Sequence, residues 1–264
     1  MPIGLEDIRR KRSFVCDMDG VLYHGNRLLP GVREFIDWLK SENKHYLFLT
    51  NSSERSPREL REKLARLGVE VPADTFYTSA LATASFLGTQ RESGSAYVIG
   101  ESGLITALHD AGFAMNEVDP DYVIVGETRS YSLEKIERAV NLVLKGARLI
   151  GTNPDLTGPV EQGITPATKA LIAPIELATG VQAYFVGKPN PLMMRHALKK
   201  LRCPREETVI IGDRMDTDML AGIEAEIDTV LVLTGVTSRG DLPRFPYQPC
   251  LVLDGVGTIP AADA

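Results

Sequence analysis

The strongest constraint on the fold is a regular alternation between short apolar runs and longer, more polar segments. The apolar runs lie at residues 14–16, 46–49, 97–99, 122–125, 149–150, 184–186, 209–211 and 230–233. Helices are predicted between them, over 31–43, 57–67, 79–90, 102–111, 132–145, 167–179, 191–202 and 216–225. Almost continuous apolarity in a strand is typical of a parallel sheet that helices cover on both faces. The pattern therefore predicts an α/β fold with right-handed crossovers.

Length, charge and cysteine usage narrow the class of protein further. The 264 residues suffice for one large domain or two modest ones, and 29 Lys and Arg against 35 Asp and Glu argue against a general nucleic-acid binder. No apolar run approaches the roughly 20 residues that span a bilayer, and the N-terminus lacks the pattern of a signal peptide. Cys16, Cys203 and Cys250 are widely spaced and form no CxxC motif. We expect a cytoplasmic protein with neither a nucleic-acid polymer nor a membrane as its partner.

A pair of acidic residues directly follows the first apolar run, in the sequence Asp17-Met18-Asp19-Gly20-Val21. On extended backbone, residues two apart point to the same side, so both carboxylates would face one spot. At an effective dielectric constant near 20 and a separation of about 5 Å, two such charges repel by about 3 kcal/mol. A nearby cation or a shared proton relieves this repulsion. Two separately solvated aspartates at a strand end are the alternative.

Three further polar motifs follow apolar runs. Thr50 and Asn51 offer a hydroxyl and an amide before a helix, Lys188 precedes a helix start, and Asp213 and Asp218 lie in GDRMDTD. Each motif also has a plain interpretation as a polar loop, a surface lysine or acids that favour the helix dipole. Because all of them follow strands, we expect a parallel sheet to bring them to one edge. Such carboxylates suit Mg²⁺, and the lysine suits a phosphate.

The motifs DMDGV, LTNSS, VGKPNP and GDRMDTD, in this order, resemble the four motifs of the haloacid dehalogenase superfamily of phosphohydrolases. Their spacing is similar to that of its class IIA branch, the NagD-like nucleotidases and 4-nitrophenylphosphatase-like enzymes. The phrases FYTSALATASFL, YVIVGETRSYS and GTNPDLTG also resemble that branch. The resemblance covers the chain from Phe14 to about Val236. It implies a Rossmann-like parallel-sheet core at 1–81 and 186–264, with an α/β cap domain of the C2 type inserted at 82–185.

The resemblance also implies roles for individual residues. Asp17 would be the nucleophile and Asp19 the general acid and base. The phosphoryl group would be held by Asp19, Thr50, Asn51 and Lys188. Mg²⁺ would bind Asp17, the backbone carbonyl of Asp19, and Asp213. Asp218 would support these ligands without binding the metal itself.

The implied activity is Mg²⁺-dependent hydrolysis of phosphomonoesters through an aspartyl-phosphate. The expected partner is a small phosphorylated metabolite, with nucleoside monophosphates such as UMP favoured. A sugar-phosphate or 4-nitrophenyl-phosphate type of phosphatase is the alternative, because TPATK at 165–169 departs from the glycine-rich sequence usual in NagD-like members. From another class, a non-catalytic or phospho-acceptor binding module is the competing hypothesis. The choice between monomer and homo-oligomer stays open.

Overall fold

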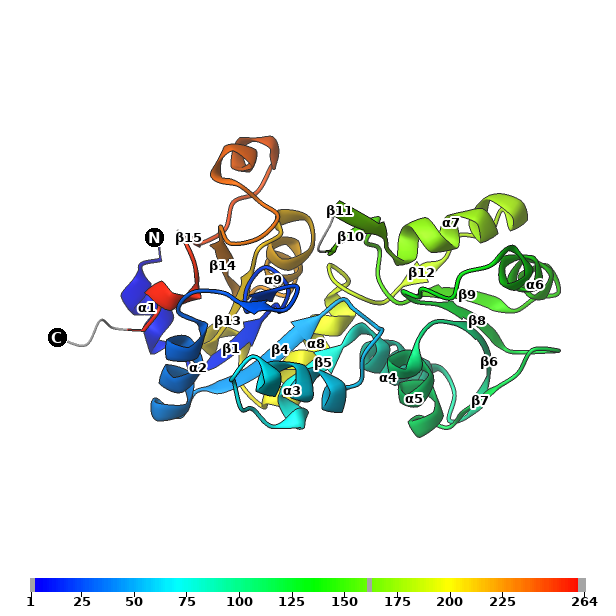
Figure 1. Ribbon diagram of the computed structural model, residues 1–264, viewed down its shortest axis with the longest axis horizontal. Helices are drawn as coiled ribbons and strands as arrows, with labels where there is room; N and C mark the ends of the chain where they lie inside the picture. The colour runs from blue at the N-terminus through cyan, green and yellow to red at the C-terminus, as the bar shows by residue number, and fades with distance from the viewer. Residues whose placement is uncertain (1–2, 161–162, 261–264) are drawn as a thin grey trace. The chain divides into compact units, whose positions relative to one another are not determined.

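The computed structural model describes residues 3–160 and 163–260, which form two compact units (Figure 1). Unit 1 takes its described residues from Met1–Thr50, Arg61–Tyr77 and Met194–Ala264, and unit 2 from Asn51–Leu60 and Thr78–Met193. Each unit contains its own parallel sheet, which confirms the α/β class. The boundaries predicted for the inserted domain, at residues 82 and 185, stay a prediction.

The sheet of unit 1 has six strands in the order β15-β14-β13-β1-β4-β5. Their bounds are β1 (Ser13–Cys16), β4 (His45–Thr50), β5 (Phe76–Thr78), β13 (Thr208–Gly212), β14 (Asp228–Val232) and β15 (Leu251–Leu253). Strand β1 pairs in parallel with β13 on one side and β4 on the other, with Val15 opposite both Ile210 and Leu47. The carboxyl ends of these three strands therefore lie at the same edge of the sheet.

Helices cover both faces of this first sheet. In α2 (Val32–Ser41), Phe35 and Trp38 pack edge-on against Phe14, with ring centroids 6.3 and 5.4 Å away. Because side chains alternate along a strand, Val15 and its partner Ile210 point to the other face, where Ile210 lies against α9 (Leu220–Glu224) at Gly222. The other α-helices with residues in unit 1 are the short α1 (Leu5–Arg10), and the longer α3 (Pro57–Arg66) and α8 (Pro191–Leu201). A short hairpin joins β2 (Tyr23–His24) to β3 (Arg27–Leu28).

The sheet of unit 2 has five strands in the order β12-β9-β8-β6-β7. Their bounds are β6 (Gly94–Ile99), β7 (Phe113–Met115), β8 (Tyr122–Val125), β9 (Arg148–Gly151) and β12 (Tyr184–Phe185). Helices α6 (Leu133–Leu144) and α7 (Thr168–Thr179) cover one face, and α4 (Ser79–Gln90) and α5 (Ser102–Asp110) lie on the other (Figure 1). Strands β10 (Thr157–Val160) and β11 (Gly163–Pro166) form an antiparallel hairpin.

The strands and helices predicted from the sequence are present, and most of their ends differ by one to three residues. The last predicted helix differs in type from the prediction. It begins as a π-helix, η3 (Met215–Met219), and only Leu220–Glu224 is α-helical. The elements that the sequence missed are mostly short: α1, the two hairpins, β5, β7 and β15. Such segments have too few residues to show a period. Within 3–160 and 163–260, no helix combines the length and apolar character that crossing a membrane requires.

The expectation that all four polar motifs end strands of one sheet is wrong for Lys188. The other three motifs follow β1, β4 and β13 of the first sheet. Lys188 follows β12, which pairs with β9 in the second sheet, with Tyr184 opposite Ile150. An apolar run indicates a buried strand, but the partner of that strand is decided by long-range packing.

Candidate active site

Three of the predicted residues, Asp17, Asp213 and Asp218, form a carboxylate cluster in unit 1. One carboxylate oxygen of each lies within 4.8 Å of the other two. Asp17 comes directly after β1, and its N–H donates to Ile211 O of β13 at 2.8 Å. Asp213 comes directly after β13. The pairing of β1 with β13 therefore places the two aspartates side by side at the carboxyl edge of the sheet.

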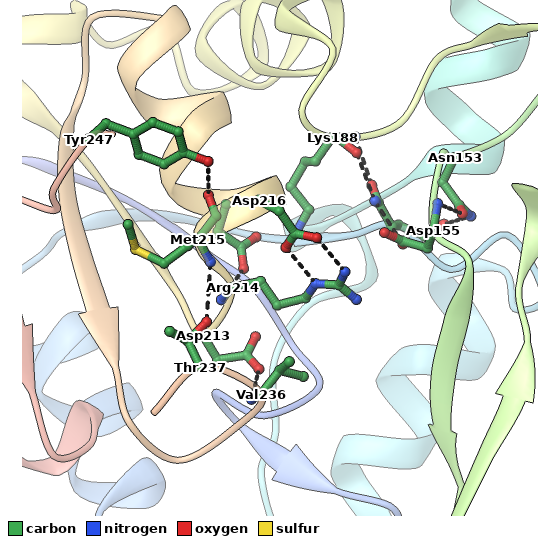
Figure 2. A network of polar contacts seen from close by, with 12 residues as sticks. Asn153, Asp155, Lys188, Asp213, Arg214, Met215, Asp216, Val236, Thr237 and Tyr247 are labelled. Atoms are coloured by element: carbon green, nitrogen blue, oxygen red, sulfur yellow. Dashed lines mark hydrogen bonds and ion pairs between the residues drawn. The ribbon is translucent and has the colours of Figure 1, made fainter. Parts of the chain in front are cut away.

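Asp213 is held by the loop that follows β14. The side chain is only 1% exposed, and its Oδ2 accepts a hydrogen bond of 2.7 Å from the N–H of Val236. Its backbone carbonyl accepts from the N–H of Thr237 at 3.1 Å. Figure 2 shows Val236 and Thr237 beside this carboxylate. A Cβ on Gly235 would lie 1.9 Å from Asp213 Oδ2, so glycine lets the loop close on the carboxylate.

The π-helix η3 gives two neighbouring acids different environments. Asp218 is fully buried, and its Oδ2 accepts from the N–H of Arg214 at 3.1 Å. Asp216 is 57% exposed and forms an ion pair of 2.8 Å with the Arg214 guanidinium (Figure 2). Met215 fixes the start of the turn, because its carbonyl accepts from the hydroxyl of Tyr247 at 3.2 Å. The turn therefore directs Asp218 into the cluster and Asp216 outward.

The cluster has the chemistry of a site for a hard divalent cation. Its donors are carboxylate oxygens, two of the three side chains are buried, and neither nitrogen nor sulfur takes part. Like charges at this separation repel, and a bound cation removes that repulsion. Mg²⁺ prefers such oxygen ligands and retains waters that leave room for a phosphate oxygen. The residues present therefore fit the predicted magnesium ion.

Asp19 and Thr50, two other predicted residues of unit 1, lie outside this cluster. Asp19 follows β1 in a turn and is exposed. The turn is fixed by a bridge between Asp19 and Tyr23, and by a hydrogen bond of 2.9 Å from the N–H of Gly20 to Tyr23 O. Thr50 is the buried last residue of β4.

Asn51 and Lys188, the predicted phosphate ligands of unit 2, contact each other through two hydrogen bonds. The N–H of Lys188 donates to Asn51 Oδ1 at 2.7 Å, and Asn51 Nδ2 donates to the Lys188 carbonyl at 3.0 Å. Asn51 Nδ2 also lies 3.0 Å from Asp155 Oδ2. Lys188 is only 2% exposed. The asparagine therefore fixes the backbone that carries the lysine.

The sequence reasoning missed one acidic residue near this pair, Glu127. Its carboxylate accepts from the N–H and hydroxyl of Ser53, at 3.0 and 2.5 Å, and from Asn153 Nδ2 at 2.6 Å. Burial raises the pKa of Glu127, and these hydrogen bonds oppose the rise. A signal exists in the sequence, because the residue comes just after the buried strand β8 and Gly126.

The fold and the carboxylate cluster define an α/β enzyme with acidic residues gathered at the carboxyl edge of a parallel sheet. Comparison with known proteins makes this class specific. Residues 14–114 match the family model of haloacid dehalogenase-like hydrolases, and residues 185–259 match a second model, described as HAD-hydrolase-like.

Named relatives cover nearly the whole chain. Dihydroxyacetone phosphatase of Corynebacterium glutamicum is 47% identical over 94% of this chain and 90% of its own length. The ribonucleotide monophosphatase NagD of Escherichia coli is 44% identical, and its structure superposes with a TM-score of 0.88 over 94% of this chain and 97% of that one. A 4-nitrophenylphosphatase from Thermotoga maritima gives 0.91 at 33% identity, over 97% of both chains.

The chain belongs to the haloacid dehalogenase-like hydrolases, in their class IIA, NagD-like branch. It is a phosphatase. The family resemblance predicted from the four motifs is thereby confirmed.

Proposed function

We propose that this phosphatase is a Mg²⁺-dependent phosphomonoesterase that works through an aspartyl-phosphate on Asp17. The observation that carries the proposal is the carboxylate cluster of Asp17, Asp213 and Asp218 after the adjacent strands β1 and β13. Three carboxylates within 4.8 Å of one another favour a divalent cation, and a divalent cation is what an anionic nucleophile needs in order to approach a phosphate.

In this proposal the metal ligands are Asp17, the backbone carbonyl of Asp19, and Asp213. Asp218 supports them, and its hydrogen bond from the Arg214 N–H keeps the carboxylate in place. Mg²⁺ held by these residues would supply positive charge that offsets the repulsion between the carboxylates and the phosphate.

The chain's own residues carry the chemical steps. A carboxylate oxygen of Asp17 attacks phosphorus, and the bond from phosphorus to the ester oxygen breaks. Asp19 gives its proton to the departing alkoxide, which leaves as an alcohol. The Asp19 carboxylate then takes a proton from water as that water attacks the phosphorus. The bond to Asp17 breaks, and inorganic phosphate and free Asp17 result.

Thr50, Asn51 and Lys188 hold the phosphoryl oxygens in the same proposal. The lysine contributes a point charge and the threonine hydroxyl a directional hydrogen bond. The Asn51 carboxamide already donates to Asp155 and to the Lys188 carbonyl, so in this proposal Asn51 would face the phosphoryl group with its main chain. The two hydrogen bonds that join Asn51 to the Lys188 backbone support this role, because they keep the lysine main chain in one conformation. Holding the reacting group in place is a large part of catalysis in phosphoryl transfer.

The proposed substrates are small phosphorylated metabolites, with nucleoside monophosphates such as UMP first. The ribonucleotide monophosphatase NagD at 44% identity supports this choice. A second substrate class, three-carbon sugar phosphates, is favoured by the relative at 47% identity, which is named dihydroxyacetone phosphatase.

Phosphate release from a panel of substrates tests the proposal. The panel contains nucleoside monophosphates, dihydroxyacetone phosphate, hexose phosphates and 4-nitrophenyl phosphate, each with Mg²⁺ and with EDTA. We expect phosphate release in the presence of Mg²⁺ and none in EDTA. The ranking of the substrates by kcat/KM then identifies the substrate class. Equal release in EDTA would contradict the metal dependence. A long-lived phosphorylated Asp17 without turnover would instead support a phospho-acceptor module.

A further inference from the structure

Glu127 stands at the start of a continuous chain of hydrogen bonds in unit 2. The residue follows β8, and its carboxylate joins two other loops of the unit. One oxygen accepts from both the N–H and the hydroxyl of Ser53, and the other accepts from Asn153 Nδ2. Ser53 and Asn153 are fully buried. A single carboxylate therefore links the segment after β4 to the segment after β9.

The chain continues from Asn153 to Asn51. Asn153 Nδ2 donates to the Asn51 carbonyl at 2.8 Å as well as to Glu127. The hydroxyl of Ser79 donates to the same Asn51 carbonyl at 2.5 Å. Two side chains from different segments thus fix the backbone of Asn51, and one of them is oriented by Glu127.

The last link joins Asn51 to the main chain of Lys188. The Asn51 carboxamide accepts from the Lys188 N–H and donates to the Lys188 carbonyl. The neighbouring Gly187 donates to Thr152 O at 2.8 Å. A Cβ on Gly187 would lie 2.8 Å from Asn51 Oδ1 and 2.7 Å from Thr152 O. The backbone at Gly187 is therefore packed so closely that its position depends on where Asn51 lies.

We propose that Glu127 is a positioning residue: through Ser53 and Asn153 it fixes Asn51, and through Asn51 the main chain of Lys188. This inference rests on the proposed function, in which Asn51 and Lys188 hold the phosphoryl group. Glu127 itself touches neither phosphate nor metal in this proposal. Its effect is on the geometry of phosphate binding, so phosphate affinity and KM are the quantities that it changes most.

The chain offers a matched control in Asp121, at the opposite end of the same strand. Asp121 precedes β8, and its Oδ2 accepts from the N–H and the hydroxyl of Ser95, at 2.8 and 3.1 Å. Asp121 therefore accepts the same two kinds of hydrogen bond from Ser95 that Glu127 accepts from Ser53. Asp121→Asn removes a carboxylate of the same kind from the same unit, but its partners, Ser95 and Arg91, are not part of the chain that reaches Asn51.

The test compares Glu127→Gln with Asp121→Asn in the full-length protein with Mg²⁺. In Glu127→Gln an NH2 group replaces one carboxylate oxygen. This group cannot accept a hydrogen bond, so the hydrogen bonds donated either by Ser53 or by Asn153 are lost. We expect the dissociation constant for inorganic phosphate, from titration calorimetry, to rise about tenfold in Glu127→Gln, and KM to rise with it while kcat changes less. Asp121→Asn should stay within about twofold of wild type in both quantities.

Hydrogen exchange separates failure of the inference from failure of the proposed function. The amides of Lys188 and Ser53 should lose about tenfold in protection in Glu127→Gln and keep it in Asp121→Asn. This readout needs no catalysis, so it judges the positioning role even if wild type releases no phosphate. If Glu127→Gln does not fold, Ser53→Ala removes the hydroxyl, which donates to the Glu127 carboxylate and accepts from the Glu127 N–H and the Thr152 hydroxyl. This variant should weaken phosphate binding in the same direction. Unchanged protection and phosphate affinity in Glu127→Gln, or equal losses in Asp121→Asn, would overturn the inference.

Discussion

The carboxylate cluster of unit 1 and the Glu127 network of unit 2 surround their buried and partly buried acids in opposite ways. Unit 1 gathers three carboxylates within 4.8 Å of one another, with Asp17 and Asp213 next to paired strands. Unit 2 places one carboxylate among hydrogen-bond donors from Ser53 and Asn153. The first arrangement has the charge of a cation site, whereas the second is completed by the protein's own donors. In the proposed function, the first group would act with a bound cation and the second would hold the backbone of unit 2 in place.

Asp17→Asn is the change with the largest expected effect on this comparison. Asparagine keeps the size of the side chain but is a poor nucleophile toward phosphorus. We expect phosphate release to fall at least about 10³-fold. Asp216→Asn is the matched control, since Asp216 is exposed and paired only with Arg214 among the interactions described, and it should keep activity within about twofold. Full activity in Asp17→Asn would exclude the aspartyl-phosphate mechanism.

Asp213→Asn tests whether the unit 1 cluster is a metal site. The amide oxygen still accepts from the Val236 N–H, but the charge is lost. We expect the Mg²⁺ concentration for half-maximal activity to rise at least about tenfold. Mg²⁺ at 100 times its dissociation constant should stabilise wild type by about 2.7 kcal/mol in thermal unfolding, and the variant much less. No stabilisation of wild type by Mg²⁺ would contradict a metal site in the cluster.

Gly235→Ala tests the close contact between the loop after β14 and Asp213. A Cβ at this position would lie 1.9 Å from Asp213 Oδ2, so the loop or the carboxylate has to move. We expect a loss of about 1–3 kcal/mol in the free energy of unfolding, and weaker binding of Mg²⁺. Gly240→Ala is the control, because its nearest neighbour would be Ser238 Oγ at 3.8 Å. Equal stability of the two variants in urea unfolding would refute the contact.

Asp121 and Glu127, at the two ends of β8, should contribute to stability with opposite pH dependence. This is the smallest of the expected effects. Hydrogen bonds from the Ser95 backbone lower the pKa of Asp121, whereas burial raises the pKa of Glu127. The stability that Asp121 contributes is therefore present at neutral pH and is lost as pH falls below about 4. The contribution of Glu127 is present at acidic pH and shrinks as pH rises above about 4.3.

Urea unfolding of Asp121→Asn and Glu127→Gln from pH 3 to 7 measures this difference. The stability gap between wild type and Asp121→Asn should widen with rising pH, by about 1 kcal/mol at most, because Asp121 is partly exposed to solvent. The gap for Glu127→Gln should narrow. Parallel pH profiles for the two variants would mean that the hydrogen bonds to Glu127, and not its burial, decide the direction of its pKa shift.

The sequence by itself determined the local elements and the identity of the family. Apolar runs such as 122–125 and the helices between them were predictable because period and composition are local properties. Asp17 and Asp213 were predictable as neighbours, since both directly follow buried strands and a parallel sheet aligns strand ends. The four motifs in their order were enough to predict the haloacid dehalogenase-like family.

Only the tertiary structure decided which sheet each motif belongs to and which acids are buried. Lys188 follows a strand of the second sheet because β12 pairs with β9, and strand pairing depends on packing between distant segments. Asp216 and Asp218 are two residues apart, yet a π-helical turn exposes one and buries the other. Glu127 gains its role from Ser53 and Asn153, which lie 74 and 26 residues away along the chain. Such contacts leave no period in the sequence, because they depend on which loops the folding of unit 2 brings together.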